Sequence, residues 1–131
     1  MIKEYQGIQP KIDETVFVAE SADIIGKVTI AKNANIWYNT VIRADVNTVT
    51  IGENTNIQDG CVIHIASNFS TIIGKNVTVG HKALIHGCKI GDNTLIGMGA
   101  IVLDGAEVGE YTLLGAGSLV PPGKKIPSGV L

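Results

Sequence analysis

The sequence has few aromatic side chains and no marked excess of charge, and these absences exclude several classes of protein. Aromatic residues make up 5% of the 131 residues although hydrophobic residues reach 45%, so the core is expected to be aliphatic. The formal net charge is −2 and no basic run is present, which argues against a nucleic-acid partner. No apolar run approaches the roughly 20 residues of a membrane helix, so no membrane partner is expected.

Cysteine is also scarce, and its two positions do not form the framework of a small secreted protein. The opening segment MIKEYQGIQPKIDETVF lacks the apolar region of a signal peptide. We therefore expect one domain in a reducing compartment, the cytoplasm.

The sequence is rich instead in a six-residue repeat, and a small or β-branched residue stands two positions before most of its aliphatic residues. Residues two apart on a strand face the same way, so each hexad directs one large and one small side chain inward. The seventeen aliphatic positions fall in four blocks: Val18, Ile24, Ile30, Ile36 and Ile42; Ile51, Ile57 and Ile63; Ile73, Val79 and Ile85; Ile90, Ile96, Val102, Val108, Leu114 and Val120.

Hexapeptide periodicity is typical of an all-β fold, the parallel β-helix, whose stacked coils bury a continuous core. The repeat resembles that of the left-handed parallel β-helix family, whose coils contain three hexads each, and this resemblance predicts between five and six coils. We expect an irregular lead-in over residues 1–15, the β-helix over 16–120 and a turn segment over 121–131. Three residues are inserted after Ile42 and four after Ile63, and one is deleted after Ile85. Such breaks map to surface loops, often at a binding face.

Counting hexads places several polar residues in two vertical columns, with coils about 4.8 Å apart. Each member of the first column directly follows an inward aliphatic residue, and each member of the second stands two residues after one. The first column contains Arg43, His64 and His86, and the second contains Tyr38, Asp59 and His81.

Direct stacking of His64 on His86 suits two imidazoles on one zinc ion, with Zn–N distances of about 2.0–2.1 Å. Because a hexad spans up to about 20 Å, His81 is not expected to reach this pair within one chain. A cyclic homotrimer would supply it from a neighbouring subunit. Three histidines with an open fourth position form the catalytic zinc pattern, which lowers the pKa of a bound water to about 7. Neutral imidazoles also bind Fe²⁺ or Co²⁺.

Other interpretations of these residues stay open. Three histidines in a chain of this size are often ordinary surface residues. Arg43 and Asp59 are either charges at coil ends or partners in an ion pair between subunits. Cys61 and Cys88 occupy the small inward position, which favours buried packing residues over metal ligands.

The segments NIWYNTVIRADVNTVTIGENTNIQDGCVIHIA and VTVGHKALIHGCKIGDNTLIGMGAIVLDGAEVGEYTLLGAGSLV resemble the gamma-class carbonic anhydrase family. The motifs that carry the resemblance are R-x-D, N-x-Q-D-G, V-I-H and G-H-x-x-x-x-H-G. The resemblance implies a left-handed β-helix of triangular coils, against the usual right-handed crossover rule, and a trimer with zinc between subunits. The implied metal ligands are His64, His81 and His86.

The resemblance also implies roles for five further residues. Arg43 and Asp59 match a salt bridge between subunits that also contacts bicarbonate, and Asp45 matches the second acid of that network. Gln58 matches a residue that hydrogen-bonds the metal-bound water, and Asn56 lies in the same motif. The implied activity is the reversible hydration of CO2 to bicarbonate by zinc-bound hydroxide at the trimer interfaces.

Two departures from the family affect this expectation. The loop after His64 is only IASNFSTI, without the glutamate proton shuttle of active members, so we expect slow turnover. The chain ends at Leu131, without the C-terminal helix of the family, which leaves the trimer to be held by the coil faces or marks a truncated form. Two alternatives stay open: a CoA-dependent acyltransferase or thioesterase on the same fold, and a catalytically weak trimeric metal-binding scaffold.

Overall fold

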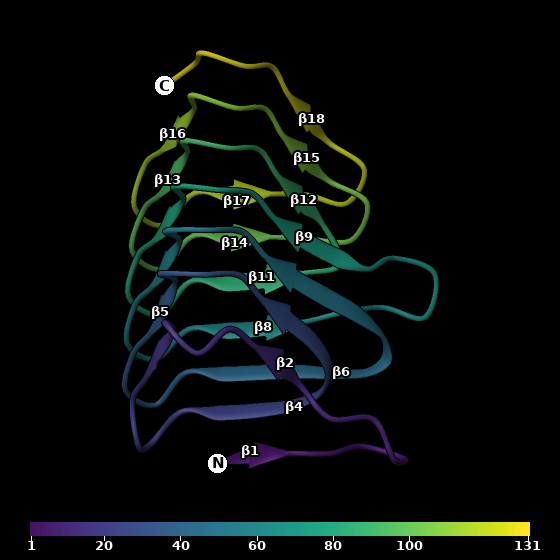
Figure 1. The fold of residues 1–131 in the computed structure, drawn as a ribbon. Helices are drawn as coiled ribbons and strands as arrows, with labels where there is room; N and C mark the ends of the chain where they lie inside the picture. The colour runs from purple at the N-terminus through teal and green to yellow at the C-terminus, as the bar shows by residue number, and fades with distance from the viewer.

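A computed structural model describes residues 1–131, and all of its regular elements are short β-strands. The strands wind around the three faces of a prism and pair in parallel with the coils above and below (Figure 1). The expected left-handed parallel β-helix is confirmed. The structure contains no helix that is long and apolar enough to cross a membrane.

Each face is a stack of strands in chain order, and two of the faces are joined because β4 (Asp23–Ile30) and β6 (Val41–Ile51) bend around a corner. The first face contains the beginnings of β4 and β6 with β1 (Ile2–Lys3), β8 (Val62–His64), β11 (Leu84–His86), β14 (Ile101–Val102) and β17 (Leu119–Val120). The second face contains their ends with β2 (Lys11–Ile12), β9 (Thr71–Ile73), β12 (Lys89–Ile90), β15 (Glu107–Val108) and β18 (Lys125–Ile126). The third face contains β3 (Phe17–Val18), β5 (Asn35–Ile36), β7 (Asn56–Ile57), β10 (Thr78–Val79), β13 (Leu95–Ile96) and β16 (Leu113–Leu114).

The hexad aliphatic residues form three inward ladders that make up the core. On the first face the paired residues, from the N-terminal coil upward, are Ile2, Ile24, Ile42, Ile63, Ile85, Val102 and Val120. From Ile24 to Val120 every one of them is at most 3% exposed. Burying an isoleucine side chain contributes about 1.5–3 kcal/mol, so the ladders dominate the stability of the fold.

The stack is longer than the hexad count predicted. The first-face ladder has seven levels because Ile2 pairs with Ile24, and β2 and β18 extend the second face at its two ends. The predicted lead-in of residues 1–15 and turn segment of residues 121–131 therefore both contain strands in register with the solenoid. Ile12 stands six residues before Val18 and Ile126 six residues after Val120, so the hexad spacing itself continues into both segments.

The breaks in the repeat all fall at the corner between the first and second faces. The insertion after Ile42 lies inside β6, which continues through it with an irregular register. The insertion after Ile63 forms a protruding loop closed by a bridge between Ala66 and Phe69 (Figure 1). Where one residue is deleted, the coil turns at Gly87, whose φ of 58° is the left-handed conformation that glycine adopts at little cost.

Candidate metal centre

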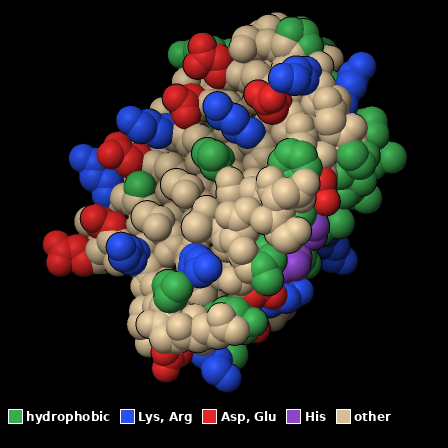
Figure 2. Space-filling view, turned by 90° about the vertical axis from the view of Figure 1, so that its right-hand side faces the viewer, with side chains coloured by type: hydrophobic (Ala, Val, Ile, Leu, Met, Phe, Trp, Pro, Cys, Tyr) green, Lys and Arg blue, Asp and Glu red, His purple; other side chains and the backbone are tan.

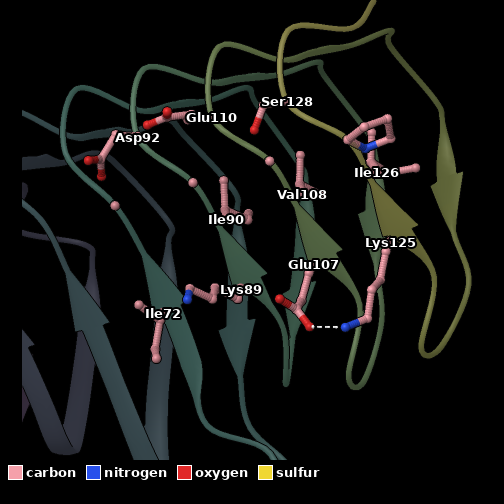
Figure 3. A pocket seen from close by; sticks show the side chains of 14 residues that line it. Ile72, Lys89, Ile90, Asp92, Glu107, Val108, Glu110, Lys125, Ile126 and Ser128 are labelled. Atoms are coloured by element: carbon pink, nitrogen blue, oxygen red, sulfur yellow. Dashed lines mark ion pairs between the residues drawn. The ribbon is translucent and has the colours of Figure 1, made fainter.

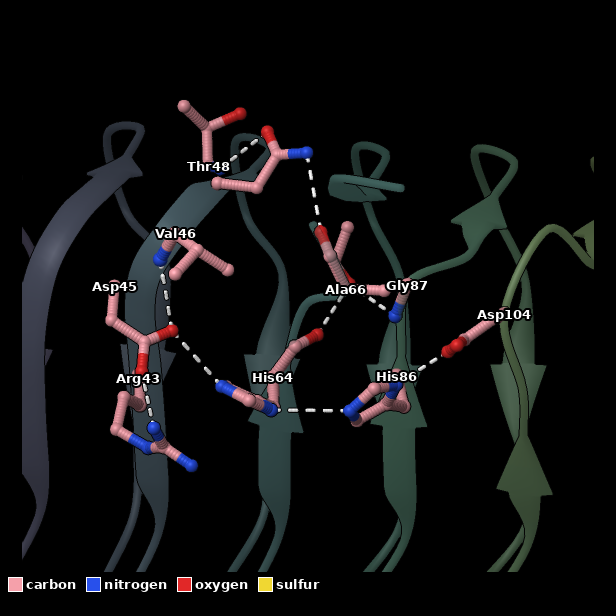
Figure 4. A network of polar contacts seen from close by, with 11 residues as sticks. Arg43, Asp45, Val46, Thr48, His64, Ala66, His86, Gly87 and Asp104 are labelled. Atoms are coloured by element: carbon pink, nitrogen blue, oxygen red, sulfur yellow. Dashed lines mark hydrogen bonds and ion pairs between the residues drawn. The ribbon is translucent and has the colours of Figure 1, made fainter. Parts of the chain in front are cut away.

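The stacked histidines lie at this irregular corner. His64 and His86 end strands β8 and β11 and are register partners on adjacent coils. Arg43 lies at the same position one coil lower, because the pairing of β6 with β8 continues from Val41 and Ile42 (Figure 4). The column expected from hexad counting is therefore present.

Each of the two histidines has a carboxylate beside its outer ring nitrogen. His64 Nε2 lies 3.1 Å from Asp45 Oδ1, and His86 Nδ1 contacts Asp104 Oδ1 (Figure 4). An ionised carboxylate only accepts hydrogen bonds, so it favours the tautomer in which the outer nitrogen carries the proton. The inner nitrogens are then left unprotonated.

These inner nitrogens, His64 Nδ1 and His86 Nε2, face each other 3.1 Å apart. The ring centroids are 5.0 Å apart and the rings are inclined at 65°. Two lone pairs at this separation repel, so the arrangement favours a positive charge between them. Two nitrogens on a tetrahedral zinc ion lie about 3.3 Å apart when each Zn–N bond is about 2.0–2.1 Å. The geometry of the pair therefore fits a bound metal ion.

Asp45 is well suited to stay ionised beside His64. Its burial raises the pKa, but hydrogen bonds from the Val46 N–H and from His64, together with the charge of Arg43, outweigh burial and hold the pKa below its usual value. Arg43 forms an ion pair with Asp45 within the chain, and half of the Arg43 side chain stays exposed. Its guanidinium group therefore remains able to contact a small anion.

Asp104 was not identified from the sequence. It stands two residues after the inward Val102, whereas His86 stands one residue after Ile85, so the two do not share a hexad position. Its side chain nevertheless reaches His86 from the coil above, across the corner tightened by the one-residue deletion. An acid on the coil next to a stacked histidine is the sequence signal that would have indicated it.

The third histidine lies at the other vertical edge of the first face. His81 Nδ1 is 3.3 Å from Asp59 Oδ1, so its Nε2 is left free. Both residues occupy the second predicted column. No group of three or more histidine, cysteine, aspartate or glutamate side chains within the chain is placed to hold a metal ion. The three histidines therefore lie at two separate corners of one chain, as the hexad count predicted.

The two amide residues of the N-x-Q-D-G motif lie beside this second corner. Asn56, on β7, donates its side-chain N–H to Asn35 Oδ1, which also accepts from Trp37 Nε1 at 2.7 Å. Gln58 and His81 both line an open, mainly apolar groove of about 420 Å³. Its lining also includes Leu95, Met98 and Leu113 and the glycines Gly80, Gly97 and Gly115.

A second hollow, of about 500 Å³, lies on the second face and has a different character. It is lined by Lys89, Glu107 and Lys125, and the carboxylate of Glu107 forms an ion pair with Lys125 at 3.0 Å (Figure 3). It contains no histidine or cysteine ligand, and its lining mixes lysines with acidic residues. We therefore assign the candidate site to the histidine corners.

The chain resembles proteins of one family over nearly its whole length. It is 51% identical over 126 residues to gamma carbonic anhydrase 1 of Arabidopsis thaliana, a match that covers 92% of this chain and 46% of the relative. It is 47% identical to the protein YrdA of Escherichia coli, with all of this chain and 75% of YrdA covered. The chain belongs to the gamma carbonic anhydrase family.

Two further comparisons agree with this family's fold. Residues 87–122 match the family model described as bacterial transferase hexapeptide (six repeats). The crystal structure of a hexapeptide transferase family protein from Anaplasma phagocytophilum superimposes with a TM-score of 0.95 at 48% identity, covering 98% of this chain and 76% of that one. The chain spans about half the length of the plant gamma carbonic anhydrase that it matches.

Within this family member the cysteines have the expected structural role. Cys61 is 0% exposed and Cys88 is 3% exposed, and both pack in the core. Burial raises the pKa of Cys61 to about 11 and that of Cys88 to about 12, so both thiols stay protonated at neutral pH. A protonated, buried thiol is a poor metal ligand, which leaves the imidazoles as the ligands of choice.

Proposed function

We propose that the protein is a zinc-dependent carbonic anhydrase that hydrates CO2 reversibly to bicarbonate at the interfaces of a homotrimer. One observation carries the proposal. All three histidines have a carboxylate beside one ring nitrogen and keep the other nitrogen free, and two of the free nitrogens face each other at 3.1 Å. Metal-ligating histidines in proteins have this same arrangement.

The surface of the first face supports the trimer. One row of outward-pointing residues on its strands begins at Asp23 and is apolar from there on, with Val41, Val62, Leu84, Ile101 and Leu119. The corresponding residues of the second face are mostly polar: Lys11, Thr29, Thr50, Ile72, Lys89, Glu107 and Lys125. Figure 2 shows charged side chains over much of the surface in view and hydrophobic side chains beside the histidines at its right-hand edge. An apolar stripe on an otherwise polar surface indicates an interaction face.

The same face also explains how the histidines would meet. His64 and His86 lie at one vertical edge of the first face, and His81 lies at the other. If three copies turn their first faces toward a threefold axis, the edge of one copy that carries His64 and His86 meets the edge of the next that carries His81. Each interface then contains all three histidines, and one site forms per subunit.

When bound, zinc supplies a Lewis acid that makes a water molecule acidic enough to provide hydroxide near neutral pH. The side chains of the chain have separate tasks around it. Asp45, Asp104 and Asp59 hold the three imidazoles in the tautomers that leave a nitrogen free. In this proposal Gln58, which lines the same groove as His81, orients the attacking water, and the exposed guanidinium group of Arg43 holds bicarbonate.

The surroundings of the site agree with an apolar substrate and with slow proton removal. The groove lined by Gln58 and His81 is mainly apolar, which suits the approach of CO2. The loop closed by Ala66 and Phe69 contains no carboxylate, so the protein has no acid there to carry protons to solvent. We therefore expect turnover to rise with buffer concentration.

The transferase names carried by the family model and the Anaplasma structure describe those proteins. A CoA-dependent acyl transfer needs one histidine as general base and no metal, whereas here all three histidines share the same carboxylate arrangement. Turnover of a CoA thioester that is insensitive to a chelator would support the transferase alternative.

Native mass spectrometry and CO2-hydration kinetics on one preparation, purified without chelator, test the proposal. We expect a trimer with three zinc ions and an activity that a chelator removes and zinc restores. Replacing His81 by alanine should abolish both bound zinc and activity. A trimer that retains zinc but does not hydrate CO2 at any buffer concentration would favour the scaffold alternative, and a metal-free trimer would refute the metal site.

A further inference from the structure

Thr71 is the one residue that contacts the backbone of both histidine-bearing coils through its side chain. Its hydroxyl donates to the carbonyl oxygen of His64 at 2.6 Å and accepts the N–H of Gly87 at 2.8 Å. Thr71 lies on β9 of the second face, and its side chain is fully buried. It therefore joins the last residue of β8 to the residue that follows β11.

This position matters because the regular pairing of the two coils ends at the histidines. From Ile63 to the next hexad aliphatic residue, Ile73, the chain takes ten residues, whereas from Ile85 to Ile90 it takes five. One coil leaves in a protruding loop and the other turns sharply at Gly87. Between the histidines and the point where the Ile72 N–H donates to the Cys88 carbonyl, the only backbone hydrogen bond between the two coils runs from the Gly87 N–H to the His64 carbonyl, at 3.2 Å.

We propose that Thr71 is a positioning residue that sets the distance between His64 Nδ1 and His86 Nε2, and therefore the affinity of the site for zinc. The inference rests on the metal site proposed above. The hydroxyl fixes the His64 carbonyl and the Gly87 amide at once, so the two histidine backbones cannot separate or slide without breaking one of its bonds. Residues that orient metal ligands in this way typically change metal affinity 10- to 100-fold when they are replaced.

The chain offers a matched control at another corner. Thr55 is also fully buried, and its hydroxyl donates to the carbonyl of Gly74 at 2.7 Å and accepts the N–H of Val77 at 3.2 Å. Thr55 has the same pair of bonds as Thr71 but contacts no histidine coil end. Thr71→Val and Thr55→Val therefore remove the same chemistry and should reduce thermal stability alike.

The test measures zinc affinity of the purified trimers by competition with a chromophoric chelator, first for the wild type and then for the variants. We expect Thr71→Val to bind zinc about 10-fold or more weakly, Thr55→Val to bind within about twofold of the wild type, and Thr71→Ser, which keeps the hydroxyl, to bind normally. If the wild type binds no zinc, the proposed function fails. If the wild type binds zinc and Thr71→Val binds it equally well, the positioning role alone is refuted.

Two further outcomes also decide the matter. A loss of affinity in Thr71→Ser equal to that in Thr71→Val would show that the hydroxyl by itself does not hold the two histidine backbones at the required distance, and would overturn the proposal. Should Thr71→Val not fold, Thr71→Cys replaces it, because Cys88 already occupies the equivalent position one coil above. A thiol is a weak hydrogen-bonding group, so Thr71→Cys should also lower zinc affinity, and unchanged affinity would refute the role.

Discussion

Mixing two metal-deficient variants tests whether each zinc site is shared between neighbouring subunits. In the proposed trimer a site needs His64 and His86 from one chain and His81 from the next. The variants His81→Ala and His64→Ala therefore lack every complete site when each is purified alone. A hybrid trimer regains a site wherever a chain with intact His64 precedes a chain with intact His81.

The size of the recovery follows from the geometry. With equal amounts of the two variants and random assembly, the chance that one chain retains His64 is one half, and the chance that its neighbour retains His81 is one half. About one quarter of the sites should be complete, or roughly 0.75 zinc ions per trimer, with CO2 hydration near 25% of the wild-type value. If all three histidines served one chain, no mixture would recover any site.

The assay denatures and refolds the two variants together and measures zinc content and CO2 hydration of the trimer fraction. A mixture of His64→Ala with His86→Ala is the matched control. Both ligands come from the same chain, so no arrangement of subunits restores a site. Recovery in this control, or none in the His81 mixture, would refute the assignment of the histidines to the two edges of the first face.

Four further outcomes are expected from the structure. Asp104→Asn should weaken zinc binding about 10- to 100-fold, because His86 loses the carboxylate that fixes its tautomer, as a chelator competition would show. Val62→Glu should convert the trimer to a monomer, measured by light scattering, because it places a charge in the apolar stripe. Tyr111→Asn should raise the melting temperature by about 4 °C, for a gain of about 1 kcal/mol, because Tyr111 has a φ of 55°. Cys88 should resist thiol reagents in the folded protein, because burial raises its pKa from the usual 9.0 to about 12. The stability that its protonated thiol contributes to the folded state is therefore complete below pH 9 and declines as the pH rises toward 12.

The chain contains controls for the first three of these. Asp92→Asn removes a corner carboxylate that does not contact a histidine, so zinc affinity should not change. Ile72 is 41% exposed on the second face and Val62 is 42% exposed on the first, so Ile72→Glu introduces the same charge without breaking the trimer. Tyr111→Phe keeps the left-handed conformation and should leave the melting temperature unchanged.

Hexad counting predicted the fold and the two polar columns because inward residues of a β-helix must repeat at fixed intervals. The stacking of His64 on His86 follows from that rule alone, and the structure shows it. The count omitted one or more levels at each end. Ile12 and Ile126 continue the six-residue spacing before Val18 and after Val120, whereas Ile2 pairs with Ile24 outside that spacing.

The residues that surround the histidines were harder to predict for a physical reason. The contacts of Asp104 and Thr71 arise at the one corner where insertions and a deletion interrupt the repeat, so their positions follow from the local path of the backbone. Hexad position indicates which side chains point inward, but it gives no information about a side chain that reaches across a corner to another coil. Such contacts are found only once the path of the loop is known.

The stacked arrangement also separates the length of the protein from its chemistry. His64 and His86 occupy the fourth and fifth of the seven levels of the first-face ladder, and each coil contacts only the coils next to it. A coil added to either end of the prism would lengthen it and leave the histidine pair unchanged. A coil inserted between β8 and β11 would move the two histidines to about twice their present spacing and remove the site. Chain length in such a protein is therefore free to vary at the ends, while the order of the two central coils is fixed by the metal that they would share.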